Sequence, residues 1–280
     1  MKNYLMGSIF WMGVLACSAV VLAQTSWAQA IPRTPDGKPD LSGTWVPGQV
    51  TGGVFAGQSS GKGNMELTKW GNDKFNWNRG PESANAPGAY RGQVVRQDQD
   101  PVKHCYPLGL VRLGPPDHNG DSNDGRAPVE IIQTPGKVTV LYEYHHEVRH
   151  IYTDGREHPK NLELTWNGHS IGRWDGDTLV VDTIGIREES WLDTGGHEHS
   201  TQLHVVERFR RDDADHLELE RTLTDPIALA KPFTTHIVLR LSPDKDLDEN
   251  VRVDCNQYMM RKPSFGEGIG GVMGISEQPE

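Results

Sequence analysis

The chain has 280 residues and a formal net charge of −10 at pH 7. It is acidic and has no long run of Lys and Arg, whereas affinity for nucleic acid depends mainly on basic side chains that neutralise phosphates. We therefore exclude nucleic acid as a partner.

Residues 1–30 have the pattern of a secretory signal peptide. Lys2 supplies the positive n-region, residues 5–23 form the apolar segment, and AQA at 28–30 matches a small-x-small cleavage site. An uncleaved membrane anchor and a lipid attached at Cys17 stay open as alternatives. We expect a periplasmic or secreted protein with no membrane span after cleavage.

The segment 31–127 is rich in Gly, Pro, Asn and Ser. It predicts an irregular region wrapped over the rest of the domain, with a first strand around Gly43–Val46 and a short helix or turn within 67–77. The polar stretch 115–128 alternates acidic and amide residues like a calcium loop, but it lacks the glycine that an EF-hand loop needs at its sixth position. We interpret it as a solvated loop.

Residues 128–262 consist of short period-2 or β-branched runs separated by tight-turn sequences. No helical run lies between them, which is typical of an antiparallel up-and-down sheet. Such a sheet closes into a barrel or forms a sandwich to bury its apolar face. We predict an all-β, lipocalin-like or calycin-like barrel that forms one domain with the preceding region, and a flexible tail at 263–280. The runs are VEIIQT, KVTVLYEYHHEVRHIYT, SIGRW, TLVVDTIGI, LHVVERFRR, HLELERTLT and FTTHIVLRLS.

Cys105 and Cys255 are the two cysteines that remain after signal cleavage. In an oxidising compartment an even pair indicates a disulfide. Two buried free thiols are the alternative.

The run Lys137–Tyr152 is interpreted as one continuous strand. Strand parity then places Tyr144, His146 and His150 on an apolar, aromatic face and Arg149 on a charged face. Apolar walls with few polar groups are typical of a ligand cavity, so His146 is a candidate catalytic residue, and Tyr144, Arg149 and His150 are candidate substrate-binding residues. The alternative is a structural face, and one bulge would exchange the two faces.

The hairpin predicted at 165–185 has DGD at 175–177 as its turn, which explains both aspartates without a catalytic role. Trp174 at this turn and Trp191 further on are candidate substrate-binding residues, because indole faces suit flat ligands. Barrel core is the alternative for each of them.

The stretch 191–209 concentrates histidines. In a regular strand His197 and His199 face the same way and can bind zinc, with a third ligand from His146, His150 or His169, whereas His204 faces the opposite way. Without a metal, Asp193 can orient His197 for proton transfer near pH 7. A metal site, an acid–base site and a structural cluster all stay open.

The candidate catalytic residues are His146, Asp193, His197, His199 and His204. The chain contains no phosphate loop of the form Gly-x4-Gly-Lys-Ser/Thr. We hypothesise an exported barrel enzyme, a lyase, isomerase or hydrolase, that acts on a small organic molecule by His, Asp and Arg chemistry with no cofactor or with a divalent metal. The alternative is a non-catalytic barrel that binds a hydrophobic or aromatic ligand.

Four motifs, RTPDGKPDLSGTW, IIQTPGKVTVLYEYHHEVRHIYTDGR, GHSIGRWDGDTLVVDT and GHEHSTQLHVVERFRR, carry a resemblance. Together they resemble a large group of exported bacterial proteins whose function is not settled, and they span about Ile31 to Cys255. The resemblance implies a signal peptide and a β-rich domain, and it carries over no residue roles. The histidine-rich YEYHHEVRH departs from the group, which makes His145 and His150 less general than the 197–204 cluster. The GTW sequence is similar to the start of lipocalin-like barrels, in which the Trp closes the barrel floor.

Overall fold

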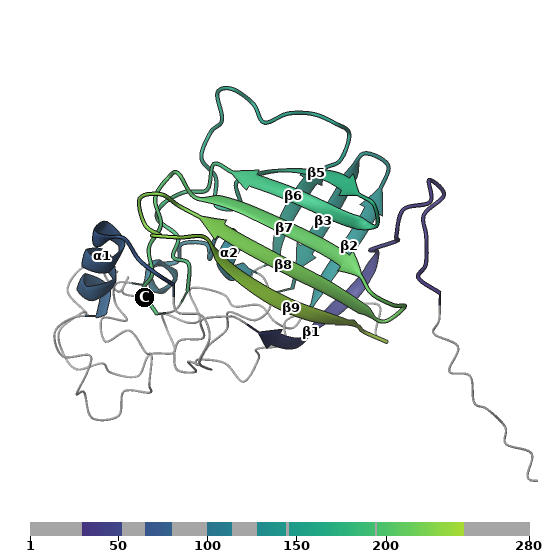
Figure 1. Cartoon of the computed structure of the whole chain (residues 1–280), viewed down its shortest axis with the longest axis horizontal. Helices are drawn as coiled ribbons and strands as arrows, with labels where there is room; N and C mark the ends of the chain where they lie inside the picture. Colours follow the sequence, from purple (N-terminus) through teal and green to yellow (C-terminus); the bar gives the residue numbers. More distant parts are fainter. Residues whose placement is uncertain are drawn as a thin grey trace, which may run out of the picture.

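A computed structural model describes residues 30–51, 65–79, 100–113, 128–143, 146–193 and 195–243. They form a closed barrel of nine strands, β1 to β9, which confirms the predicted all-β barrel (Figure 1). The signal peptide, the tail, Tyr144 and Cys255 lie outside these residues. No helix in the described ranges is long and apolar enough to cross a membrane.

The strands follow the period-2 runs of the sequence. A helix, α1, forms where a short helix or turn was predicted, and α2 precedes the second strand. The elements are β1 (Gly43–Thr51), α1 (Lys69–Arg79), the 3₁₀ helix η2 (Pro101–His104), α2 (Leu110–Leu113), β2 (Val129–Thr134), β3 (Lys137–Tyr142), β4 (Glu147–Tyr152), β5 (His169–Asp175), β6 (Thr178–Ile184), β7 (His204–Arg211), β8 (His216–Thr224) and β9 (Phe233–Leu241).

Each strand pairs with its neighbours in sequence, and β1 pairs with β9 to close the barrel. All pairs are antiparallel except β4 and β5, which run parallel and pair only at Ile151–Ser170 and Tyr152–Ile171. The prediction of an entirely antiparallel barrel is therefore wrong at this seam. A parallel pair needs a connection that returns along the barrel, and residues 153–168 provide it.

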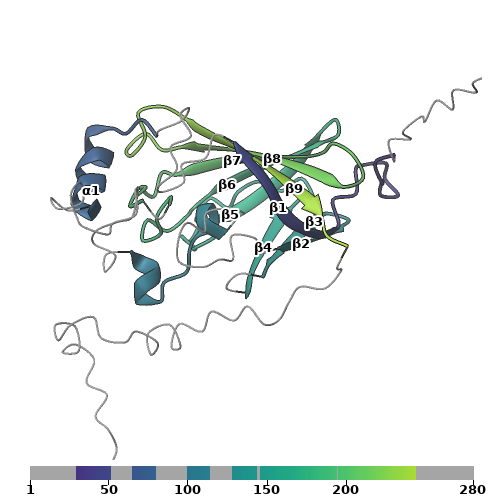
Figure 2. The ribbon, with the colours of Figure 1, turned by 90° about the horizontal axis from the view of Figure 1, so that it is seen from below.

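The two ends of the barrel differ. Short turns at 135–136, 176–177 and 212–215 form the turn end, and long connections at 185–203 and 225–232 form the loop end. In Figures 1 and 2, α1 stands at the loop end, whereas residues 30–42 lie at the turn end.

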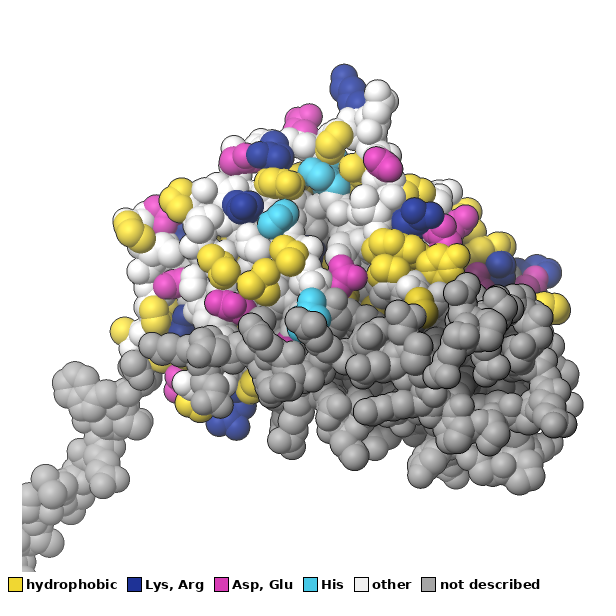
Figure 3. Space-filling view, turned by 180° about the vertical axis from the view of Figure 1, so that it is seen from behind, with side chains coloured by type: hydrophobic (Ala, Val, Ile, Leu, Met, Phe, Trp, Pro, Cys, Tyr) yellow, Lys and Arg dark blue, Asp and Glu magenta, His cyan; other side chains and the backbone are white. Residues whose placement is uncertain are grey.

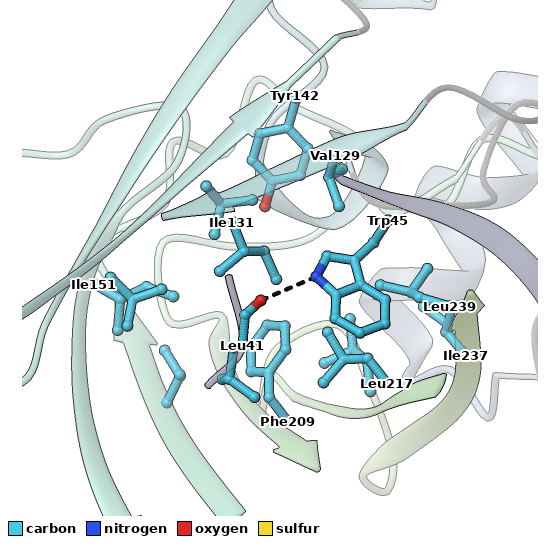
Figure 4. Close-up of a cluster of buried hydrophobic side chains, with 14 of the residues drawn as sticks. Leu41, Trp45, Val129, Ile131, Tyr142, Ile151, Phe209, Leu217, Ile237 and Leu239 are labelled. Carbon is cyan, nitrogen blue, oxygen red and sulfur yellow. Dashed lines mark hydrogen bonds between the residues drawn. The ribbon is translucent and has the colours of Figure 1, made fainter. Parts of the chain in front are cut away.

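Two apolar clusters fill the barrel. Trp45 is fully buried and its indole Nε1 donates to the carbonyl of Leu41, 2.9 Å away, among side chains from β1, β2, β3, β7, β8 and β9 (Figure 4). A second cluster contains Leu110 and Val111 of α2 with Val205 and Leu223. The inward positions of the strands are thus occupied by side chains along much of the barrel axis.

The run Lys137–Tyr152 is a hairpin and not the single strand that was predicted. A turn lies between β3 and β4, where the NH of His146 donates to the carbonyl of Glu143 and His146 has a φ of 52°. The turn changes the strand parity, so Arg149 is buried and His150 is exposed. The predicted face assignment is therefore inverted throughout β4.

The strand predicted to carry His197 and His199 is also absent, since residues 185–203 are a loop and β7 begins at His204. The described residues of this loop form two isolated bridges, one between Trp191 and Glu198 within the loop and one between Ile186 and Thr165. Strand parity consequently does not decide where His197 and His199 point.

Candidate functional site

A cleft opens in the barrel wall between β4 and β5. One edge of β4 pairs with β3 along its whole length. The other edge pairs with β5 at only two positions, so on that side Glu147–His150 lie opposite residues 165–168 and not opposite a strand. The cleft has a volume of about 340 Å³ and is lined by residues 147–150, Tyr152 and 165–170. It lies between two strands, so side chains from both the inner and the outer surface of the barrel reach it.

The inner wall of the cleft carries Arg149. Its Nε donates to Ser170 Oγ at 3.1 Å, and its Nη2 donates to Thr183 Oγ1 at 3.0 Å and to Glu207 Oε2 at 2.5 Å. The side chains of Arg149 and Glu207 are 2% and 0% exposed. A second cation, Arg221, donates from Nε to Glu207 Oε1 at 3.0 Å and from Nη1 to the carbonyl of Val111.

We call Arg149, Glu207 and Arg221 the inner network. Burial alone would raise the pKa of Glu207, but the two guanidinium groups outweigh burial and lower it. Burial likewise opposes the charge of Arg149, yet Glu207 and Tyr142 raise its pKa. Burial raises the pKa of Tyr142, so this phenol is neutral at pH 7. Two cations therefore share one carboxylate inside the barrel.

A chain of histidines and one aspartate lies beside the cleft and reaches it at His169. His169 Nδ1 lies 2.8 Å from His158 Nδ1, and His158 Nε2 lies 3.0 Å from Asp182 Oδ1. The other carboxylate oxygen, Asp182 Oδ2, lies 3.0 Å from Nε2 of His204. We call these four residues the outer chain. Figure 3 shows the face opposite to that of Figure 1, where exposed histidines stand among hydrophobic and charged side chains.

The hydrogen bonds of the outer chain determine its tautomers. The pKa of Asp182 is lowered, chiefly by its hydrogen bond from His204 and against the effect of burial, so the carboxylate is ionised and only accepts. His158 then donates from Nε2, and in its neutral form it accepts at Nδ1. His169 must donate from Nδ1, which leaves its Nε2 as a proton acceptor.

Protonation of His169 is disfavoured by its surroundings. Burial is the main cause that lowers its pKa, and the nearby Arg156 cation also disfavours a charge on the ring, so the imidazole is neutral at pH 7. In contrast, the hydrogen bond to Asp182 raises the pKa of His204. Tyr152 stacks on His169 with ring centroids 5.6 Å apart. The cleft thus combines a neutral base with an aromatic wall.

The predicted pair of Asp193 and His197 lies in the 185–203 loop. Asp193 Oδ2 is 2.7 Å from His197 Nδ1, and Asp193 Oδ1 accepts from the backbone NH groups of Gly195 and His197. Although burial raises the pKa of Asp193, His197 outweighs it and the pKa is lowered. His197 is 9% exposed and stacks on Phe75 of α1 at 4.2 Å. The loop therefore holds the predicted carboxylate–imidazole pair.

His199 is enclosed. Its Nδ1 donates to the carbonyl of Ser200, and its Nε2 lies 2.9 Å from Ser190 Oγ. Burial lowers the pKa of His199, and a Cβ at Gly109 would lie 2.6 Å from Ser190 Oγ. Both ring nitrogens of His199 are therefore engaged, and Ser190 and His199 are both buried.

The remaining predicted residues are dispersed. His146 is exposed in the β3–β4 turn, and His150 lines the cleft. Trp174 packs against the core cluster at the turn end, and Trp191 is buried. Cys105 follows η2, but its predicted disulfide partner Cys255 lies outside the described residues, so the disulfide stays a prediction.

Zinc binding at His197 and His199 stays a prediction: His197 Nδ1 is hydrogen-bonded to Asp193, and both ring nitrogens of His199 have hydrogen-bond partners. Among the residues that the structure describes, no group of three or more His, Cys, Asp or Glu has the arrangement of a metal site.

The sequence interpretation missed His158 and Asp182. Asp182 stands between Val181 and Thr183, both inward and fully buried, so strand parity alone points it outward. An acid flanked by buried residues within a strand was a usable signal. His158 lies in the irregular 153–168 connection, where no periodicity could place it.

No protein-family model matches the chain, and no curated protein is significantly similar to it. The fold and the polar contacts define a nine-stranded β-barrel with a buried network of His, Asp and Arg side chains.

Proposed function

We propose that the protein is an exported barrel enzyme that performs acid–base chemistry on a small organic molecule in the β4–β5 cleft, with His169 as the base. The observation that carries this proposal is the hydrogen-bond chain from Asp182 through His158 to His169, which ends at the cleft. A histidine oriented by an ionised carboxylate is a common arrangement for general-base catalysis.

In this mechanism His169 Nε2 removes a proton from the substrate. Positive charge then develops on the imidazole, and Asp182 stabilises it through His158. The guanidinium of Arg149 stabilises an oxyanion that forms on the substrate in the cleft. A base and an oxyanion stabiliser together can serve elimination, isomerisation or hydrolysis.

His204 supports the base indirectly in this proposal, because it occupies the second oxygen of Asp182. The Asp193–His197 pair remains a second candidate for proton transfer, since a neutral His197 that donates to Asp193 can accept a proton at Nε2. The ring of His197 stacks on Phe75 of α1, whereas His169 lines the cleft directly.

The alternative hypothesis, a barrel that carries a hydrophobic ligand along its axis, has less support. The inward side chains form two apolar clusters with the inner network, so they occupy positions that such a ligand would need.

The test is exchange of substrate C–H hydrogens in D₂O, followed by NMR over a panel of small hydroxy and keto acids. We expect exchange at one or more panel members, a loss of about 10²-fold or more in His169→Gln, and a smaller loss in His158→Gln. His236→Gln, an exposed histidine on β9, is the control. Full exchange by folded His169→Gln would refute this base, and loss in His197→Ala alone would move the site to the loop.

Export and the Cys105–Cys255 disulfide are part of the proposal. Mass measurement of protein recovered from the producing cell should give a chain that begins after residue 30 and is lighter by two hydrogens than the reduced form. An intact residue 1–30 segment would contradict cleavage.

A further inference from the structure

Two buried polar atoms in residues that line the cleft have no protein partner. They are Nη1 of Arg149, a donor, and Oδ1 of Asn167, an acceptor, and neither has a hydrogen-bond partner of good geometry within the described part of the chain. The Arg149 guanidinium also interacts with the phenol of Tyr142, which is neutral and cannot balance its charge. The other end of the Asn167 amide is fixed, since its Nδ2 donates to Glu147 Oε2 at 3.0 Å. Leaving a buried donor or acceptor unpaired is unfavourable, so both atoms indicate groups of a bound ligand.

The inner network is also charged. Arg149 and Arg221 share the single carboxylate of Glu207, and Tyr142 is neutral because burial raises its pKa. One positive charge therefore remains on this network in the barrel interior. An uncompensated buried charge is costly, and an anion bound at Arg149 Nη1 would compensate it.

We infer that the substrate of the cleft is a small hydroxy carboxylate with one negative charge and a flat apolar part. This inference rests on the proposed function for its reaction and names the substrate class. The carboxylate accepts from Arg149 Nη1, and the hydroxyl donates to Asn167 Oδ1. The flat part lies against Tyr152 and Trp166, which line the cleft. Glu147, which also lines the cleft, disfavours a second negative charge on the ligand.

Binding of three matched probes tests the inference without turnover. Mandelate carries the carboxylate, the hydroxyl and a phenyl ring, phenylacetate lacks the hydroxyl, and 1-phenylethane-1,2-diol lacks the charge. Calorimetric titration at pH 7 should give a Kd for mandelate about tenfold or more below that of the diol, with phenylacetate between them. Equal affinity for mandelate and the diol, or no mandelate binding, would overturn the inference.

Two variants locate the binding. Asn167→Asp adds a negative charge in the cleft and should weaken mandelate binding about tenfold or more, whereas Asn161→Asp makes the same change at an exposed position outside the cleft and should not. Arg221→Met removes the excess positive charge but keeps Arg149, and it should also weaken binding. Equal binding by Asn167→Asp and Asn161→Asp would contradict the site.

His169→Gln separates the two proposals. It should bind mandelate like the wild type while C–H exchange is lost. Charge-selective binding without any exchange in the wild type would refute the proposed function alone. Exchange of neutral substrates with no preference for carboxylates would refute the substrate class alone.

Discussion

The inner and outer surfaces of the same strands carry two polar systems of opposite character. Ser170 faces the inner network and the adjacent His169 belongs to the outer chain, and the same is true of Thr183 and Asp182 on β6. The inner network is buried and permanently charged, whereas the outer chain is partly exposed and titrates. Alternation along a strand therefore places a fixed charge and a proton acceptor on either side of one wall.

The inner network should dominate stability. Glu207→Gln leaves two buried cations without a carboxylate, and we expect the free energy of unfolding to fall by about 3–5 kcal/mol. Arg221→Met should cost less, because it leaves Arg149 and Glu207 as a neutral pair. Denaturant unfolding at neutral pH measures both. The control is Arg208→Gln on the outer surface, which loses an exposed ion pair with Asp175 and should cost less than about 1 kcal/mol. Similar losses for Glu207→Gln and Arg208→Gln would remove the distinction between the surfaces.

A methyl group added at Gly168, in the turn before His169, should lower the stability of the protein. Gly168 has a φ of 64°, and a Cβ there would lie 2.6 Å from the carbonyl oxygen of Ile184. Gly168→Ala should therefore lower the free energy of unfolding by about 2–3 kcal/mol and move His169. Gly155→Ala is the matched control, since Gly155 has a φ of 85° and nothing within 4 Å of its Cβ position. It should lose only about 1 kcal/mol from backbone strain. Equal losses would show that the contact with Ile184 is unimportant.

The outer chain should make a pH-dependent contribution of less than about 1 kcal/mol to the free energy of unfolding, since its groups are partly exposed. The pKa of Asp182 is lowered, so its contribution to stability is present above the ordinary aspartate pKa and is lost as pH falls through the lowered value. The pKa of His204 is raised, so its contribution is complete below the ordinary histidine pKa and is lost as pH rises through the raised value.

The difference in unfolding free energy between wild type and Asp182→Asn should therefore be greatest between about pH 4 and 6.5. NMR titration of His204 should show a lower pKa in Asp182→Asn than in the wild type. An unchanged pKa would mean that this hydrogen bond does not form in solution.

The smallest effect is expected at the turn end. Asp177 forms an exposed ion pair with Arg33. Asp177 follows the last residue of β5, whereas the cleft is lined by the first two residues of that strand. Asp177→Asn should change neither denaturant unfolding nor mandelate binding measurably, because exposed pairs are screened by water. A measurable change in binding would show that the turn end influences the cleft.

Several strands could be placed from the sequence, since VEIIQT, TLVVDTIGI and HLELERTLT alternate apolar and polar residues and end at turn sequences. The structure of the histidine-rich segments could not be predicted in this way. Lys137–Tyr152 contains an internal turn that no Gly or Pro signals, and residues 185–203 show no regular alternation of apolar and polar residues. In each segment one wrong assumption about a continuous strand reversed or removed the expected facing of the histidines. Arg149 and His150, which the sequence predicts as substrate-binding residues, both line the cleft, but each lies on the face opposite to the predicted one.

The sequence by itself determined the barrel class and most strand positions, because local alternation of apolar and polar side chains is sufficient to define a strand with one buried face. Only the tertiary structure decided the site. Its cleft comes from the parallel pairing of β4 with β5, and its contacts join His158 to Asp182, Arg149 to Glu207, and Arg221 to Val111 across long stretches of chain. Such contacts depend on closure and register of the whole barrel, which local periodicity does not encode.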